Sequence, residues 1–167
     1  MATAPQVTDR IVQDAIVRAV QNVCRTMLRQ DAVLTASTAE GATGPEGTFQ
    51  ILSSVGFAGV ASGMVYLCLS DDFALTATAQ ILGMSPAEVE MHGPDVLKDA
   101  IGEVTNMTAG GFKNELCDLG FPCKLTLPTI LRGHNLTVAS VKSAARHVFT
   151  FDCKGHRLVV DIQLKFD

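Results

Sequence analysis

The sequence predicts an α+β fold in which a layer of helices packs on a largely antiparallel β-sheet. Two long segments, residues 7–34 and 95–119, repeat apolar residues with helical spacing. Shorter runs rich in β-branched and aromatic residues have the character of strands, two before the second long segment and three after it. This grouping of helices and strands along the chain is typical of α+β domains.

The length of 167 residues suits a single domain that spans residues 1–167 and has a well-formed core. The 13 Lys and Arg residues are outnumbered by 17 Asp and Glu residues and form no basic block, so a nucleic-acid partner is not expected. Charged residues make up only 18% of the chain, against about 25% in an average soluble domain. We therefore expect some apolar surface to contact a partner.

The cysteines and the first residues of the chain indicate in which cellular compartment the protein is expected. Five cysteines occur without a C-x-x-C pair: Cys24, Cys68, Cys117, Cys123 and Cys153. An odd number without ligand spacing favours reduced thiols over a disulfide framework or a zinc site. The first ten residues lack the pattern of a signal peptide, and no stretch approaches the ~20 apolar residues of a membrane span. These features predict a cytoplasmic protein with no membrane contact.

The first half of the chain is expected to contain a helix, a loop and a hairpin. Residues 7–34 have the helical spacing noted above. Residues 37–47 are rich in Gly, Ser and Thr and predict a surface loop. Residues 49–56 and 60–69 are apolar runs on either side of glycines, which predicts a β-hairpin.

Two shorter helices are expected next. Asp71 or Asp72 can cap a helix that ends at Gly83, where a left-handed residue is favoured. Residues 85–88 read Ser-Pro-Ala-Glu, which is the spacing of a capping box with Pro at the first helical position. Residues 92–94, His-Gly-Pro, stop this segment within two turns.

The long helix predicted over residues 95–119 is followed by three predicted strands, 135–142, 146–152 and 157–166. Short turns separate these strands, which suggests an antiparallel meander.

The long helix has two faces. At about 100° per residue, one side collects the apolar stripe and the other the polar residues. The stripe consists of Leu97, Ile101, Val104, Thr108, Phe112 and Leu116, and the opposite side of Asp99, Glu103, Asn106, Gly110 and Lys113. Glu103 and Asn106 stand at i and i+3, so their side chains emerge about 5–6 Å apart and can enter one small cleft of a partner together.

Periodicity alone is also satisfied if Glu103 and Asn106 are simply the solvated face of an amphipathic helix. Asn is a mediocre helix former, and each of Gly102, Gly110 and Gly111 costs about 1 kcal/mol relative to Ala in a helix interior. Something other than helix propensity therefore selects these residues. Small residues leave the backbone open to close approach by a protein partner or a neighbouring helix.

The segment from Ala100 to Gly110, Ala-Ile-Gly-Glu-Val-Thr-Asn-Met-Thr-Ala-Gly, resembles the active-site helix of the CheC/CheX chemotaxis phosphatases, and most closely that of CheX. Residues 59–69 resemble the family's glycine-punctuated second strand and residues 73–83 its following helix. Residues 127–133 resemble the segment that leads into its last strands. The resemblance covers most of the chain and is weakest in residues 1–48.

This resemblance implies a phosphatase for a phosphorylated response regulator of the CheY type. In the family, the Glu and Asn of the helix enter the active site of the regulator's receiver domain. Here Glu103 would pair with the receiver's lysine, and Asn106 would orient the attacking water. No cofactor of the chain's own is implied, because the magnesium ion belongs to the receiver. Such a division suits phosphoryl transfer to water, which needs mainly positioning and charge neutralisation.

The resemblance also bears on the number of sites and on assembly. CheC-type members carry a second Glu-x-x-Asn on the first long helix, whereas here Ala19 precedes Asn22 at that spacing, which implies the single-site arrangement of CheX. CheX itself is a homodimer, so a homodimer is expected. Gly111 departs from the family pattern, in which a bulkier polar residue is more usual. The alternative function is a non-catalytic module of the same fold that docks a receiver or serves as a flagellar-switch scaffold; retention of both Glu103 and Asn106 favours the enzyme.

Other chemistry finds little support. The four histidines never form an H-x-x-x-H or H-E-x-x-H pair, so a metal site is not expected. The sequence lacks G-x-S-x-G, G-x-G-x-x-G and P-loop patterns, which argues against a serine hydrolase and a nucleotide site. Asp95, Asp99 and Glu103 share one side of the long helix, and this arrangement fits mutual repulsion as well as it fits a cation site.

Overall fold

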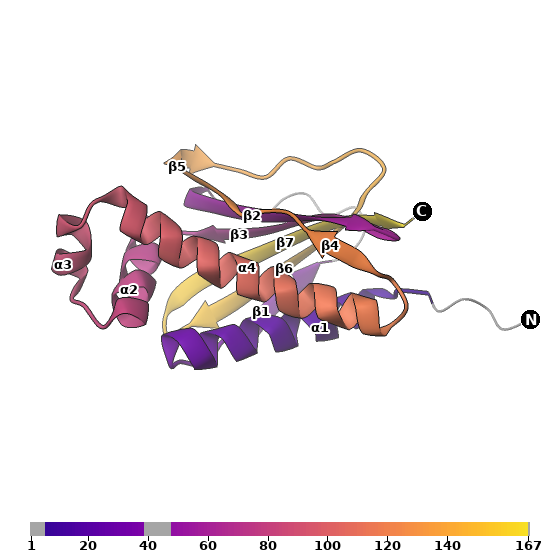
Figure 1. The fold of residues 1–167 in the computed structure, drawn as a ribbon, viewed down its shortest axis with the longest axis horizontal. Helices are drawn as coiled ribbons and strands as arrows, with labels where there is room; N and C mark the ends of the chain where they lie inside the picture. Colours follow the sequence, from indigo (N-terminus) through magenta and orange to yellow (C-terminus); the bar gives the residue numbers. More distant parts are fainter. Residues whose placement is uncertain (1–5, 39–47, 167) are drawn as a thin grey trace, which may run out of the picture.

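The computed structural model describes residues 6–38 and 48–166, and it contains one antiparallel seven-stranded sheet with helices along one face (Figure 1). The helices are α1 (Asp9–Val23), α2 (Asp71–Leu82), α3 (Pro86–Met91) and α4 (Pro94–Asp118). The strands are β1 (Val33–Thr38), β2 (Phe49–Gly59), β3 (Ala61–Leu69), β4 (Cys123–Leu125), β5 (Thr129–Leu136), β6 (Ala145–Cys153) and β7 (His156–Phe166). The predicted α+β class is therefore confirmed.

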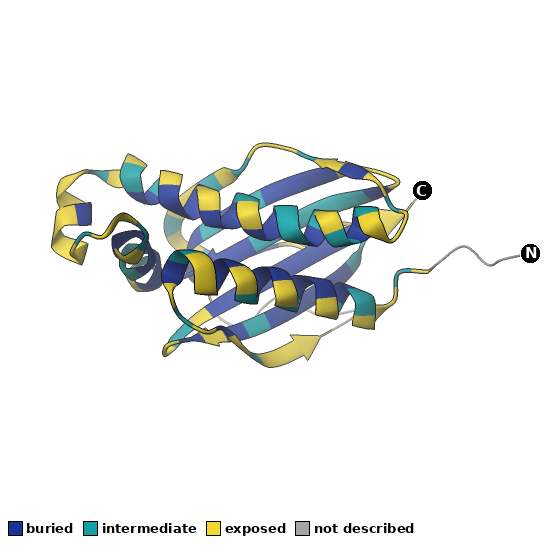
Figure 2. Cartoon of the chain, turned by 60° about the horizontal axis from the view of Figure 1, so that its bottom comes forward, coloured by how far each residue is buried: buried dark blue, intermediate teal, exposed yellow. Residues whose placement is uncertain are grey.

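The sheet runs in the order β1-β6-β7-β3-β2-β4, and β5 also pairs with β2. Helices α1 and α4 lie side by side across it, with buried residues toward the strands and exposed residues outward (Figure 2). Helices α2 and α3 lie at one end (Figure 1). None of the helices in the described part of the chain is long and apolar enough to cross a membrane.

The first helix is shorter than its apolar spacing predicts. Helix α1 ends at Val23 and continues as a π-helical turn, Cys24–Leu28, after which Arg29 takes a left-handed φ of 52°. Residues 33–38, expected to be helix and then loop, instead form β1, which pairs with β6. The prediction was wrong here because the strand owes its existence to partners more than 100 residues further along the chain. The rest of the predicted loop, residues 39–47, lies outside the described residues.

The predicted hairpin is confirmed. Strands β2 and β3 pair in antiparallel register, with Val55 opposite Val65. Gly63 is required by close packing, because a Cβ built there would collide with the backbone oxygen of Gln163 on β7.

Helix α2 is capped by Ser70 rather than by Asp71 or Asp72. The Ser70 hydroxyl oxygen accepts a 3.1 Å hydrogen bond from the backbone N–H of Phe73. Asp71 instead accepts a 3.1 Å hydrogen bond from the guanidinium of Arg132. Gly83 ends the helix with a φ of 66°, as predicted.

The third helix has the predicted N-cap, Ser85, although only one of the two hydrogen bonds of a capping box is present among the described residues. The Ser85 hydroxyl oxygen accepts a 3.2 Å hydrogen bond from the backbone N–H of Glu88, and Pro86 is the first residue of α3.

The predicted three-strand meander is half correct. Strands β6 and β7 pair as expected, but residues 137–142 are not a strand. Strand β5 begins at Thr129 and pairs with β2 at the other side of the sheet. Strand β4, which was not anticipated, extends the same edge of β2. The partners of a strand depend on the tertiary fold and cannot be predicted from the local sequence pattern.

The apolar core fills the space between the helices and the sheet. Side chains alternate across the strands, so Phe149 and Val160 face the helices, whereas Val148 and Val159 face away. Val138 covers Val148 and Val159, which gives the far face a small apolar cluster of its own. The helical layer, and with it α4, therefore rests on a sheet that is packed on both faces.

Candidate functional site

The long helix predicted over residues 95–119 is α4, and its buried and exposed faces are the predicted ones. Gly93 precedes the helix with a φ of 90°, and Pro94 supplies the first helical residue. Every residue of the predicted apolar stripe is buried: Leu97, Ile101, Val104, Thr108, Phe112 and Leu116. The opposite side of the helix consequently faces away from the sheet.

Glu103 and Asn106 lie on that outward side. Glu103 is exposed and Asn106 is half-buried. The i, i+3 spacing on a continuous helix brings their Cβ atoms within about 5–6 Å of each other. Neither side chain has a hydrogen-bond or ion-pair partner among residues 6–38 and 48–166. A carboxylate and an amide are thus presented together with their polar atoms available to another molecule.

Contacts with α1 hold one side of α4 in place. Arg18 donates two hydrogen bonds to the Glu115 carboxylate, from Nε at 3.1 Å and from Nη2 at 2.9 Å. Gly111 faces Ala19, and a Cβ built at Gly111 would lie only 3.1 Å from the Ala19 Cβ. The departure from the family pattern at Gly111 therefore allows the two helices to approach closely, and the residue does not point into the outward face.

Pro128, which precedes β5, and Ile130, near its start, lie against the other side of α4. Gly102 is buried there, and a Cβ built on it would lie 3.1 Å from Ile130 Cδ1 and 3.8 Å from Pro128 Cγ. Leu127, next to Pro128, is 88% exposed.

One buried polar contact ties α4 directly to the sheet. The hydroxyl oxygens of Thr105 on α4 and Ser53 on β2 are hydrogen-bonded at 2.6 Å, and both residues are 0% exposed. The Thr105 hydroxyl also reaches the carbonyl oxygen of Ile101 at 2.7 Å. Sequence reasoning missed this contact, because a serine in an apolar strand and a threonine beside an apolar stripe carry no signal that they will meet.

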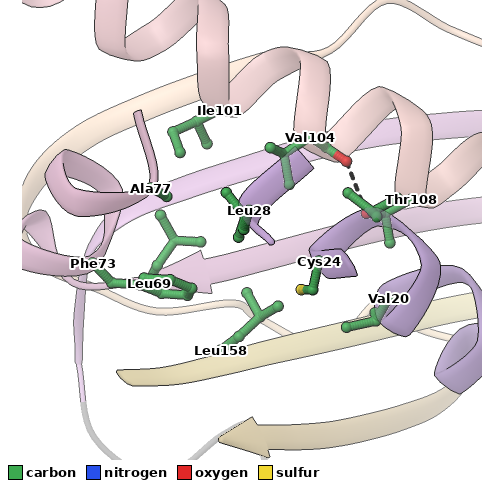
Figure 3. Close-up of a pocket in the computed structure, with 11 residues that line it drawn as sticks. Val20, Cys24, Leu28, Leu69, Phe73, Ala77, Ile101, Val104, Thr108 and Leu158 are labelled. Carbon is green, nitrogen blue, oxygen red and sulfur yellow. Dashed lines mark hydrogen bonds between the residues drawn. The ribbon is translucent and has the colours of Figure 1, made fainter. Parts of the chain in front are cut away.

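A small apolar cavity lies beneath α4 (Figure 3). Its volume is about 20 Å³, and its walls include Val20 of α1, Phe73 of α2 and Val104 of α4. A space of this size holds roughly one water-sized probe, and a water would find few polar partners there. The cavity is therefore a packing defect in the core and is too small for a substrate.

The described residues do not gather ligands for a metal or a second Glu-Asn pair. Within residues 6–38 and 48–166, no three His, Cys, Asp or Glu side chains cluster closely enough to hold an ion, and the acids Asp95, Asp99 and Glu103 form no such group. Ala19, where CheC-type members carry the second Glu, is 7% exposed and lies against α4.

Comparisons with known proteins identify the family of the chain. The model of the family "Chemotaxis phosphatase CheX" matches residues 51–152, which is more than half of the chain and includes Glu103 and Asn106. No curated protein sequence matches significantly.

Solved structures share the fold at low sequence identity. A CheC-like superfamily protein from Shewanella sp. PV-4 is 19% identical, with a TM-score of 0.83 over 95% of this chain and 99% of that chain. CheX from Desulfovibrio desulfuricans is 20% identical, with a TM-score of 0.78 over 92% of this chain and 99% of that one. The CheX–CheY–BeF3–Mg complex from Borrelia burgdorferi contains a chain that is 20% identical, with a TM-score of 0.72 over 92% and 97%. With its CheC-like fold and the family match across its central strands and α4, the chain belongs to the CheX chemotaxis phosphatase family.

Proposed function

We propose that this protein hydrolyses the aspartyl-phosphate of a CheY-type receiver domain, and that Glu103 and Asn106 enter the receiver's active site together. The observation that carries the proposal is the pair itself. In a chain of the CheX family, a carboxylate and an amide stand side by side on the outward face of an anchored helix, without partners among the described residues.

Glu103 supplies the docking contact. Its exposed carboxylate forms a salt bridge with the conserved lysine of the receiver when the two proteins meet. The pair is desolvated only in the complex, so it contributes to recognition of the receiver rather than to the stability of the free protein.

Asn106 supplies the position of the nucleophile. Its amide oxygen accepts a hydrogen bond from a water and holds that water in line with the phosphorus atom. The water oxygen forms a bond to phosphorus while the bond to the aspartyl oxygen breaks. The aspartate leaves as a carboxylate, and the water's second proton passes to the phosphate or to solvent. An amide cannot act as a base, and none is needed, because the aspartate carboxylate is a good leaving group.

The metal belongs to the partner in this mechanism. The receiver brings its own magnesium ion, which neutralises charge on the phosphoryl oxygens. The described residues of this chain offer no cluster of metal ligands, and the CheX–CheY complex from Borrelia burgdorferi contains both Mg and the phosphate mimic BeF3.

The test measures phosphate loss from a radiolabelled CheY-type receiver with and without the protein. Wild-type protein should accelerate the loss, and Asn106→Ala should abolish nearly all of that acceleration. Asn114→Ala is the matched control, because Asn114 is an exposed asparagine further along the same helix. If Asn106→Ala retains activity within about twofold of wild type, a barrier change below ~0.5 kcal/mol, the role given to Asn106 is wrong.

A binding experiment separates the two residues and addresses the alternative of a non-catalytic docking module. The probe is a receiver locked by beryllofluoride, with affinity measured by calorimetry. Glu103→Gln should weaken binding and slow turnover together, whereas Asn106→Ala should slow turnover at nearly unchanged affinity. If wild-type protein binds the locked receiver without accelerating phosphate loss, the docking module is correct.

A further inference from the structure

The buried hydrogen bond between Ser53 and Thr105 lies directly behind the outward pair. Thr105 follows Glu103 by two residues and precedes Asn106 by one. Its hydroxyl points to the sheet, whereas Glu103 and Asn106 lie on the outward side of the helix. It is a side-chain hydrogen bond that joins α4 to a strand, and both of its hydroxyls are fully buried.

A second buried threonine on the same helix, Thr108, has no hydrogen bond to the described strands of the sheet. The hydroxyl of Thr108 donates to the carbonyl oxygen of Val104 at 2.8 Å, within α4 itself (Figure 3). Thr105 makes the equivalent bond to Ile101 at 2.7 Å and adds the 2.6 Å bond to Ser53 on β2. The two threonines thus share burial and local bonding, and they differ in contact with the sheet.

Small residues on the flanks of α4 leave part of its rotation about the helix axis to be set by other contacts. The flanks of the helix carry small residues: Ala100, Gly102, Ala109, Gly110 and Gly111. Such flanks allow close approach but offer few side chains that interlock with neighbours. Apolar contacts are also non-directional, whereas a hydrogen bond prefers a narrow range of angles. A directional bond at the centre of the helix therefore resists rotation that the flanks would tolerate.

Small rotations matter at the outward face. Side-chain ends lie about 5–6 Å from the axis of a helix, so a rotation of about 10° moves them by about 1 Å. A misplacement of about 1 Å can reduce a reaction rate by about 100-fold. Asn106 is more sensitive than Glu103, because the longer Glu side chain can follow its lysine partner by changing rotamer.

We propose that the Ser53–Thr105 hydrogen bond is a positioning contact that sets the rotation of α4 on the sheet and thereby aims Asn106 at the attacking water. The inference rests on the proposed function, since it assigns these two residues a part in the same site. Neither residue touches the receiver; both act through the helix that carries Asn106.

The test compares Thr105→Val with Thr108→Val in steady-state dephosphorylation of the phosphorylated receiver. Valine keeps the shape of threonine and removes the hydroxyl in both variants. Thr105→Val should lower kcat between about 10- and 100-fold while KM stays within about threefold. Thr108→Val should leave both constants within about threefold of wild type. Thr105→Val also leaves the buried Ser53 hydroxyl without its partner, so the folded fraction of both variants is measured alongside kcat.

Two further variants guard against a folding defect. Thr105→Ser keeps the hydroxyl and should restore kcat to within about threefold of wild type. The double variant Ser53→Ala with Thr105→Val removes both hydroxyls, so no buried polar group is orphaned and the fold should be retained. Its kcat should remain as low as that of Thr105→Val, with circular dichroism and urea unfolding to establish that it is folded.

The outcomes distinguish this inference from the proposed function. If wild-type protein accelerates phosphate loss and Thr105→Val has the same kcat as Thr108→Val, the positioning role is overturned and the function stands. A folded double variant with wild-type kcat also overturns it. If wild-type protein does not accelerate phosphate loss, the proposed function fails and the positioning role fails with it.

Discussion

Replacing Asp161 by Asn should destabilise the protein more than any change at its surface. Asp161 lies on β7, on the sheet face away from the helices, and pairs with Arg146 on the neighbouring strand β6. The side chains are 0% and 6% exposed. Arg146 donates from Nη2 to the carboxylate at 2.6 Å and from Nε at 3.1 Å.

Arg146 also holds the segment that follows β5. Its Nη1 donates to the Ser140 hydroxyl at 2.7 Å, and its Nη2 donates to the Val138 carbonyl oxygen at 2.8 Å. Gln163 donates to the carbonyl oxygen of Ala139 at 2.9 Å. The ion pair is thus the centre of a network that attaches residues 138–140 to the far face of the sheet.

The magnitude follows from burial. Removing one partner of a buried ion pair costs about 3–5 kcal/mol, because the other charge is left uncompensated. A guanidinium cannot release its proton, so in Asp161→Asn the charge of Arg146 persists. Since domains are stable by only about 5–15 kcal/mol, the loss should be a large part of the free energy of unfolding.

Urea unfolding at neutral pH, followed by circular dichroism, measures this loss. The control is Arg132→Met, which breaks the half-exposed pair between Arg132 and Asp71 (42% and 43% exposed) and should cost no more than about 1 kcal/mol. If Asp161→Asn costs less than about 1 kcal/mol with an unchanged m-value, water reaches the pair and the argument from burial is wrong.

The complementary variant Arg146→Met should show a pH dependence. Burial raises the pKa of the Asp161 carboxyl, and the hydrogen bonds and charge of Arg146 oppose that rise. Without Arg146, the folded state binds this proton more tightly than the unfolded state does. Stability of the variant relative to wild type should therefore be greatest at acidic pH and fall as the pH rises from the unfolded pKa of about 3.9 through the raised folded value. A relative stability that rises with pH over this window would contradict the assignment.

Three further predictions concern packing, thiols and assembly. Val20→Ile places one methylene against the cavity beneath α4 and should raise the free energy of unfolding by up to about 0.8 kcal/mol. Val65→Ile adds the same group where the core is already filled and should lower the free energy of unfolding by about 1–3 kcal/mol; thermal unfolding compares the two variants. Burial raises the pKa of the Cys68 thiol to about 12, so iodoacetamide at pH 8 should label the half-buried Cys117 first and Cys68 only after unfolding, as peptide mass spectrometry can check. We also expect a homodimer joined through a strand edge, because β1 is an exposed edge strand without Lys or Pro; light scattering that gives a monomer mass at all micromolar concentrations would refute it.

The sequence by itself predicted the parts of the fold that depend on local pattern. The N-cap at Ser85 and the helix end at Gly83 depend only on residues within a few positions, and both formed as expected. The hairpin of β2 and β3 has partners close in sequence, so its pairing could also be anticipated. The predicted cap, Asp71 or Asp72, was one or two residues too late. Ser70 and Asp71 are both good caps, and the Asp71 carboxylate is instead bound by the distant Arg132.

Strand partners were not predictable in the same way. Residues 33–38 form a strand because β6 offers them an edge, and β5 pairs with β2 although the meander would have placed it beside β6. In both cases the partner lies far away in sequence, and the hydrogen bonds that stabilise the strand exist only after the chain has folded.

The candidate site was likewise predictable where it depends on local pattern and unpredictable where it depends on tertiary contacts. Helical periodicity predicted which side of residues 95–119 would be buried, and so predicted that Glu103 and Asn106 would share the opposite face. The rotation at which the helix rests on the sheet was decided by the tertiary structure. It depends on the contact of Gly111 with Ala19 of α1 and on the hydrogen bond of Thr105 to Ser53 of β2. Both contacts join residues that are dozens of positions apart in the sequence. Helical periodicity carries no information about how far the helix turns to make them.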